Sequence, residues 1–129
     1  MRKLLVLLVA SVSVLAACKK TEVVPGLIGK WELRHTHGGF LGHDSLYHAG
    51  NGNIYQFNRD STYKLYNNGA LATSGKFHIS KGNDFQLPSA NSIFFDDSPY
   101  GDVVEITGSK LTIGTTVADG VAYEYVKLN

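Results

Sequence analysis

The sequence predicts an all-β domain, a small antiparallel up-and-down β-barrel of about eight strands. From Gly26 onward apolar and polar residues alternate in short runs, and no window holds a sustained helical repeat of apolar positions. The chain has 14 glycines and only 3 prolines, a balance that indicates many turns. Nearly all the connections after Asn53 are too short for crossovers, so successive strands should pair with their neighbours. Closing such a sheet removes its exposed edges, which favours a barrel over the alternative, a sandwich.

The first strand is expected to run through Trp31 and to end near His37. Residues of one parity should face inward, and they are Trp31, Leu33, His35 and His37. Residues of the other parity should form a charged, solvated face, and they are Lys30, Glu32, Arg34 and Thr36. This strand therefore predicts an interior that is aromatic at one end and carries imidazoles at the other.

Seven more strands follow, most of them bounded by turn residues. Their expected ranges are 54–58, 61–66, 71–79, 92–96, 103–107, 110–115 and 121–128. Arg59-Asp60, Asn67-Asn68-Gly69 and Gly108-Ser109 supply tight turns between neighbouring strands. Pro88 interrupts residues 85–90, which are expected to form a loop or a poor edge strand.

The first eighteen residues are typical of an export signal. Arg2 and Lys3 precede an apolar stretch that is too short to span a bilayer comfortably. The stretch ends in Leu15-Ala16-Ala17-Cys18, which resembles the lipobox of bacterial lipoproteins, and Cys18 is the only cysteine in the chain. The resemblance implies cleavage before Cys18, a diacylglyceryl group on its thiol and a further acyl chain such as palmitate. An ordinary secreted protein with a stray cysteine is the alternative.

These features predict a signal peptide at 1–17, a lipidated cysteine with a tether at 18–25 and the barrel domain at 26–129. Arg2 and Lys3 leave with the signal peptide, so the 12 basic residues become 10 against 11 acidic ones, a net charge of −1. We therefore expect a monomer held at the membrane by its lipid and no nucleic-acid partner. In enterobacterial lipoproteins an Asp after the lipidated cysteine favours the inner membrane. Lys19 in that position favours the outer membrane of the bacterial envelope, with the periplasmic or surface side left open.

Several short motifs together resemble the lipocalin-like (calycin-type) domains of small bacterial lipoproteins. Gly29-Lys30-Trp31 is similar to the Gly-x-Trp start of that group, and the other matching segments are 57–63, 74–77, 110–113 and 123–128. The resemblance implies that Trp31 closes the barrel base and that a basic residue of the last strand covers its indole. Lys127 takes that position here, where the family usually carries Arg. It also implies a lumen that binds a small apolar or amphipathic molecule.

A ligand site is therefore expected at the barrel end opposite Trp31. Six residue steps of about 3.3 Å place His37 near the rim and His35 just inside it. Phe40 and Tyr47 lie on a glycine-rich connection that is able to act as a lid. The candidate ligand-binding residues are His35, His37, Tyr47, Tyr55, Tyr63, Tyr123 and Tyr125. The alternative for the aromatic residues is that they only fill the core.

Four of the chain's five histidines lie between residues 35 and 48, which raises the question of a metal site. His35 and His37 would supply two ligands for Zn²⁺ or Cu²⁺, with His43, Asp44 or His48 completing the set. The glycine-rich spacing matches no tight ligand signature, and a loop over a barrel mouth needs polar residues in any case. We therefore assign no metal and no cofactor from the sequence. The carboxylates of residues 96–102 lack calcium-loop spacing and indicate a turn.

No catalytic residues are assigned, and the chain is not expected to be an enzyme. His43-Asp44-Ser45 contains the residue types of a catalytic triad, but neighbours in sequence do not adopt its relayed geometry. Small-molecule binding is the expected function. The alternative is a protein-binding envelope module, an inhibitor or accessory subunit whose barrel is filled and whose apolar patch lies outside.

Overall fold

The computed structural model describes residues 24–82 and 87–129. The signal peptide, Cys18 and most of the tether lie outside the described residues, as do 83–86. The described chain forms nine strands and one 3₁₀ turn, η1 (Val117–Asp119). The strands are β1 (Gly29–Gly38), β2 (His43–Leu46), β3 (Ile54–Phe57), β4 (Thr62–Asn67), β5 (Ala70–Lys81), β6 (Asn91–Phe95), β7 (Asp102–Thr107), β8 (Lys110–Gly114) and β9 (Val121–Leu128). Within these residues no helix has the length and apolarity needed to cross a bilayer.

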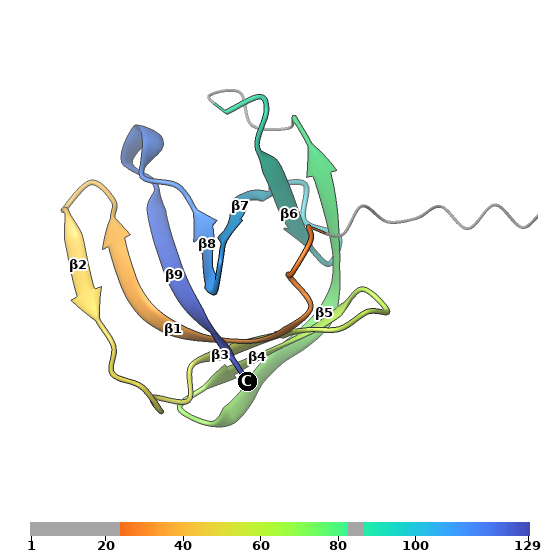
Figure 1. The fold of residues 1–129 in the computed structure, drawn as a ribbon. Helices are drawn as coiled ribbons and strands as arrows, with labels where there is room; N and C mark the ends of the chain where they lie inside the picture. The colour runs from red at the N-terminus through yellow and green to blue at the C-terminus, as the bar shows by residue number, and fades with distance from the viewer. Residues whose placement is uncertain (1–23, 83–86) are drawn as a thin grey trace, which may run out of the picture.

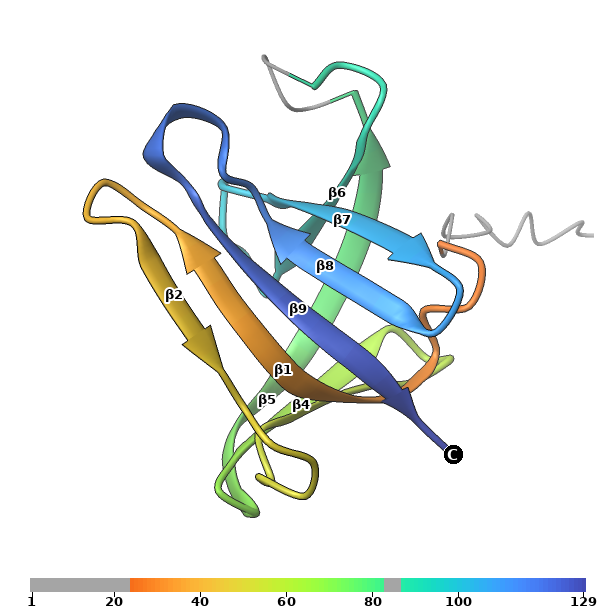
Figure 2. The same ribbon diagram turned by 60° about the vertical axis from the view of Figure 1, so that its left-hand side comes forward.

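Eight of the strands close into an antiparallel barrel, which confirms the predicted fold (Figures 1 and 2). Neighbours in sequence pair from β3 through to β9, and β9 pairs with β1 to close the sheet. All seven later strands occur where the alternation predicts them. Strand β2 was not predicted. It extends the same edge of β1 that β3 occupies, because β3 pairs with Gly29–Glu32 and β2 pairs with His35–Gly38.

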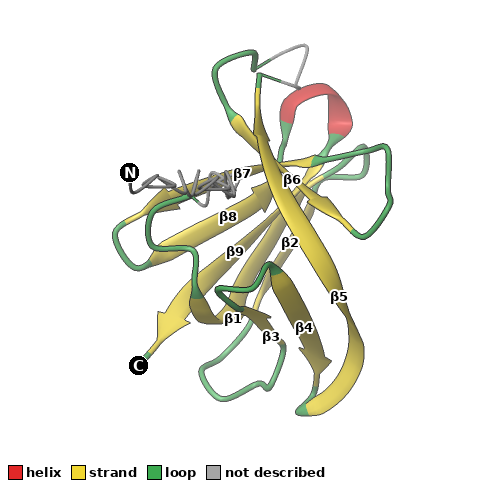
Figure 3. Ribbon diagram, turned by 90° about the vertical axis from the view of Figure 1, so that its right-hand side faces the viewer, coloured by secondary structure: helices red, strands yellow, loops and turns green. Residues whose placement is uncertain are grey.

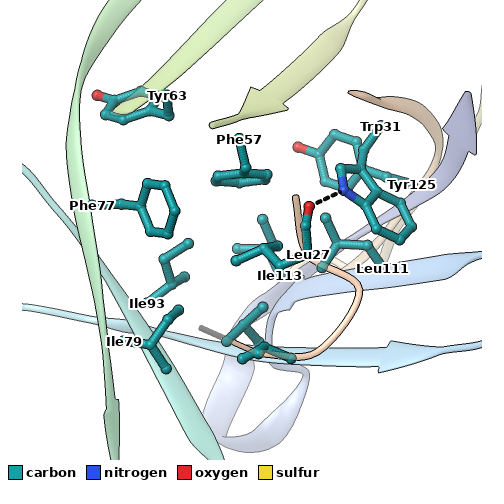
Figure 4. Packing of buried hydrophobic residues seen from close by; sticks show 12 residues of the cluster. Leu27, Trp31, Phe57, Tyr63, Phe77, Ile79, Ile93, Leu111, Ile113 and Tyr125 are labelled. Atoms are coloured by element: carbon teal, nitrogen blue, oxygen red, sulfur yellow. Dashed lines mark hydrogen bonds between the residues drawn. The ribbon is translucent and has the colours of Figure 1, made fainter. Parts of the chain in front are cut away.

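The base of the barrel is built around Trp31, which is fully buried (Figure 4). Its indole Nε1 donates a hydrogen bond of 2.7 Å to the carbonyl oxygen of Leu27. The ammonium of Lys127 lies 5.1 Å from the centroid of the Trp31 ring and donates to the carbonyl of Gly26 at 2.7 Å. The segment before β1 is thereby tied to the last strand across the base. Phe57, Leu27, Ile93 and Leu111 are also fully buried.

A β-bulge interrupts β1 at Arg34. Leu33 pairs with Tyr125 and His35 pairs with Glu124, so Arg34 has no partner on β9. On the opposite edge of β1, its carbonyl accepts a hydrogen bond of 2.8 Å from the backbone N–H of Tyr47, next to the His35–Leu46 pair. Because the extra residue reverses the alternation, His35 and His37 lie on the opposite side of the sheet from Trp31 and Leu33. The prediction that both imidazoles point into the lumen is therefore wrong.

The outward face of β1 is also not uniformly solvated, because Glu32 is only 3% exposed. Its Oε2 lies 2.8 Å from Nη1 of Arg34 and accepts the backbone N–H of Gly50 at 3.1 Å. Oε1 accepts the N–H of Gly52 at 3.4 Å. The connection between β2 and β3 thus covers this carboxylate, and the expectation of a wet charged face fails at this position.

The end of the barrel away from Trp31 carries the β1–β2 hairpin and η1 side by side (Figures 2 and 3). The N–H of Gly39 donates to the carbonyl of Gly120 at 2.8 Å, which joins the two connections. A Cβ at Gly38 would lie 2.6 Å from the same carbonyl oxygen, so only glycine allows this approach.

Candidate functional site

The barrel has a cavity of about 470 Å³, partly open to solvent, in the half away from its base. This volume is within the range of small-molecule sites. Leu33 lies two residues beyond Trp31 along β1, and Leu65 lies two beyond Tyr63 along β4, so the cavity begins where the buried core ends. Its lining residues are Leu33, Tyr47, Asn53, Tyr55, Leu65, Asn67, Asp102, Ile113, Tyr123 and Tyr125.

Tyrosine side chains dominate the wall of the cavity. The ring of Tyr55 stacks on Phe57 with centroids 5.3 Å apart and on Phe95 with centroids 5.5 Å apart. It meets Tyr125 edge to face at 5.6 Å. Burial raises the pKa of Tyr55 to about 12 and also raises the pKa of Tyr125. Both hydroxyls are therefore neutral hydrogen-bonding groups at physiological pH, and packing holds their rings in place.

Asp102 is the one carboxylate among the lining residues. It begins β7, and its side chain keeps part of its surface exposed. Burial nevertheless raises the pKa of Asp102, because desolvation disfavours the charged form. A carboxylate short of solvation is stabilised by any donor or cation that enters beside it. The polar side of the cavity also includes Asn53 and Asn67.

The structure brings together four of the candidate ligand-binding residues. Tyr47, Tyr55, Tyr123 and Tyr125 line the cavity. Tyr63 lies deeper, is 5% exposed and donates its hydroxyl to Oδ2 of Asp96 at 3.0 Å. Phe40 is 85% exposed and is not a lining residue, so of the two expected lid residues only Tyr47 reaches the cavity.

His35 and His37 do not line the cavity but face Glu124 on the other side of the wall. Nδ1 of His35 lies 3.3 Å from Oε2 of Glu124, and Nε2 of His37 lies 3.4 Å from Oε1. Nε2 of His35 lies 2.6 Å from Oδ1 of Asp44 on β2. Lys110 adds a 2.7 Å contact to Oε1 of Glu124. The site expected at the open end is thus divided. The tyrosines line the cavity on the inner face of the sheet, whereas His35 and His37 lie on its outer face.

The other two histidines of the segment do not join this group. Nδ1 of His48 lies 3.0 Å from the carbonyl oxygen of Ala49, and the residue is exposed. His43 pairs with Gly38 and is exposed at the end of β2, and the carboxylate of Asp44 contacts His35 instead.

Three polar lining residues of the cavity were not predicted from the sequence: Asn53, Asn67 and Asp102. The position of Asp102 could have been predicted from strand alternation. It shares parity with Val104, which is 2% exposed in the core, so alternation along β7 places its carboxylate inside. The acidic composition of residues 96–102 had pointed only to a turn. Asn53 and Asn67 also share parity with lining residues, Tyr55 and Leu65. Each lies one residue beyond the last pair between β3 and β4.

Comparison of the chain with protein-family models, with curated proteins and with solved structures found no match.

Proposed function

We propose that this chain is a lipid-anchored protein of the bacterial envelope whose lipocalin-like barrel binds a small amphipathic molecule. The observation that carries the proposal is the cavity of about 470 Å³, which is lined by apolar, tyrosine and carboxylate groups. The lipobox-like Leu15-Ala16-Ala17-Cys18 supports the anchor, and Lys19 supports the outer membrane as its destination.

The lining favours a ligand with an apolar body and a cationic or hydrogen-bond-donating end. Leu33, Leu65 and Ile113 offer apolar contacts, whereas Asp102 offers a partly desolvated negative charge. Tyrosine faces attract cations through their ring quadrupole. A primary ammonium on a short alkyl chain satisfies these three features at once.

Calorimetric titration of three probes of matched chain length tests this preference. The protein is residues 18–129 with Cys18→Ser, so that it remains free of lipid, and the probes are decylamine, decanol and decanoate. We expect decylamine to bind most tightly and decanoate least tightly. Asp102→Asn should weaken decylamine about tenfold or more, since a hydrogen bond to a charged group contributes about 1.5–3 kcal/mol, and should leave decanol nearly unchanged.

Asp97→Asn is the matched control, because this carboxylate is exposed and is not a lining residue of the cavity. Absence of binding by all three probes would contradict the ligand-binding function. Equal loss of decylamine binding in both Asn variants would instead remove the role given to Asp102.

The second candidate is a protein-binding module, and a specific surface feature favours it. Phe40, Leu41 and Leu46 in the β1–β2 hairpin are 85%, 79% and 82% exposed. Strand β2 pairs only with β1 among the described strands, so its other edge retains free backbone donors and acceptors. The cavity argues against the filled barrel that this alternative was expected to have.

A further inference from the structure

Three side chains with metal-binding atoms meet on the outer wall of the barrel. They are His35 and His37 from β1 and Glu124 from β9, and one ligand atom from each lies within 4.8 Å of the others. They share a face because of the bulge at Arg34, since Glu124 alternates with Tyr123 and Tyr125, which line the cavity on the inner face. The cluster is thus separate from the proposed ligand site and does not depend on it.

The distances suit a tetrahedral ion. Ligand atoms that lie about 2.0–2.1 Å from a tetrahedral centre are about 3.3 Å from one another. Nδ1 of His35 lies 3.3 Å from Oε2 of Glu124, and Nε2 of His37 lies 3.4 Å from the other oxygen, Oε1. The two imidazole rings are themselves adjacent, with centroids 4.5 Å apart. The three ligand atoms lie within 4.8 Å of one another, so side-chain rotation has to bring them closer around a common point.

A carboxylate behind His35, that of Asp44, is a second feature that indicates a metal site. Its Oδ1 lies 2.6 Å from Nε2 of His35. In the neutral tautomer whose Nε2–H donates to this carboxylate, the lone pair is on Nδ1. Nδ1 is the atom that faces Glu124. A carboxylate that orients a histidine from behind in this way is the usual partner of a metal-ligating imidazole and raises its basicity.

We propose that His35 Nδ1, His37 Nε2 and one carboxylate oxygen of Glu124 bind a divalent transition-metal ion, with Zn²⁺ as the best fit. Imidazole and carboxylate ligands suit this ion, and three protein ligands leave a fourth position for water. The side chains are 26%, 32% and 22% exposed, so the ion reaches them directly from solvent. Asp44 is a positioning residue, because it acts through His35.

Lys110 is the competitor for this site. Its ammonium lies 2.7 Å from Oε1 of Glu124, and its side chain is 51% exposed. In the metal-free protein it supplies the positive charge that the ion would otherwise bring. Removing it frees the carboxylate and removes repulsion, so Lys110→Gln should bind Zn²⁺ more tightly.

Protons compete as well. The hydrogen bond with Asp44 is the largest cause that raises the pKa of His35; desolvation lowers this pKa, and the contact with Glu124 raises it further. A proton and an ion compete for the same lone pair of Nδ1, so the two exclude one another there. The charged groups that face the cluster are Lys110 from β8, Glu124 from β9 and Asp44 from β2.

Calorimetric titration of the Cys18→Ser protein with Zn²⁺ alone tests the site, with Co²⁺ absorption as a second readout of tetrahedral geometry. We expect one ion per chain, loss of binding in Glu124→Gln and a drop of about 10–100-fold in Asp44→Asn. Asp44 has a side chain that is 75% exposed, so this variant should fold normally. His48→Asn is the matched control and should bind as the unaltered protein does.

Several results would overturn the site. These are no binding of Zn²⁺ at millimolar concentration, unchanged binding in Glu124→Gln, or a loss in His48→Asn as large as the loss in Asp44→Asn. Circular dichroism of each variant separates loss of the site from loss of the fold. Binding of decylamine serves as an independent check, because the cavity lies on the other face of the sheet.

Discussion

Replacement of Trp31 by Phe is the sharpest test of the barrel base. The variant loses the indole N–H that donates to the carbonyl of Leu27 at 2.7 Å, and Leu27 itself is fully buried. An orphaned buried acceptor costs about 1–3 kcal/mol. The smaller ring also leaves a void of about 40 Å³, which at about 24 cal/mol per Å³ costs about 1 kcal/mol. We therefore expect the free energy of unfolding to fall by about 2–4 kcal/mol.

Urea unfolding followed by far-ultraviolet circular dichroism measures this loss without a tryptophan signal. With a slope of about 1.3 kcal/mol per molar urea for a domain of this size, the midpoint should fall by about 2 M. Tyr100→Phe is the control, because its side chain is 84% exposed and its midpoint should not move. A fall of less than about 0.5 M in the Trp31 variant would show that the base does not depend on this hydrogen bond and its packing. The folded variant should still bind decylamine, since Trp31 does not line the cavity.

Two further predictions concern the anchor and the outer wall. In a diderm host supplied with labelled palmitate, the unaltered chain should incorporate label and Cys18→Ala should not, and a soluble, unlabelled unaltered chain would contradict the anchor. In the metal-free protein the pKa of His35 is raised above 6.5, chiefly by Asp44, so its stabilising contribution is complete below that pH and is lost as the pH rises through the raised value. Urea midpoints measured from pH 5.5 to 8.5 should show this loss, and in Asp44→Asn the slope should flatten. An equal slope in the two proteins would mean that the Asp44 contact does not set the titration.

Most of the strands could be predicted because local signals agree with the fold. Asn68 and Gly69 have φ values of 50° and 81°, as a tight hairpin turn between β4 and β5 requires, and both residue types tolerate them. Strand β2 offered no such signal. Its four residues are all exposed, so it buries no apolar face and its place is fixed by pairing with β1 alone.

The candidate site was predictable only where alternation continued without interruption. Tyr55, Tyr123 and Tyr125 line the cavity as their parity suggests. The alternation of β1 through His37 is regular in the sequence, yet Arg34 is an unpaired extra residue in the β1–β9 ladder. This bulge is a feature of the pairing between the first and last strands, which no local pattern encodes.

The role of Glu124 could not be predicted either, because its partners lie far from it in the sequence. It lies 89 residues from His35 along the chain, and only the register between β1 and β9 brings the two together. The histidines suggested a metal site by composition, but the carboxylate that completes it is a single residue between two tyrosines of the last strand. Its neighbours in sequence point into the cavity, and nothing local distinguishes it from a solvated outward residue.

The β1–β9 pairing therefore determines both faces at once. It closes the barrel between the first and last strands, places Tyr123 and Tyr125 in the cavity and places Glu124 opposite His35 and His37. A slip of one residue would exchange the two faces of β9, which would bury the carboxylate and expose the tyrosines. An ion bound by both strands binds only the native register, and at 100 times its dissociation constant it would stabilise that register by about 2.7 kcal/mol. The outer site would thus help to hold the seam on which the inner one depends.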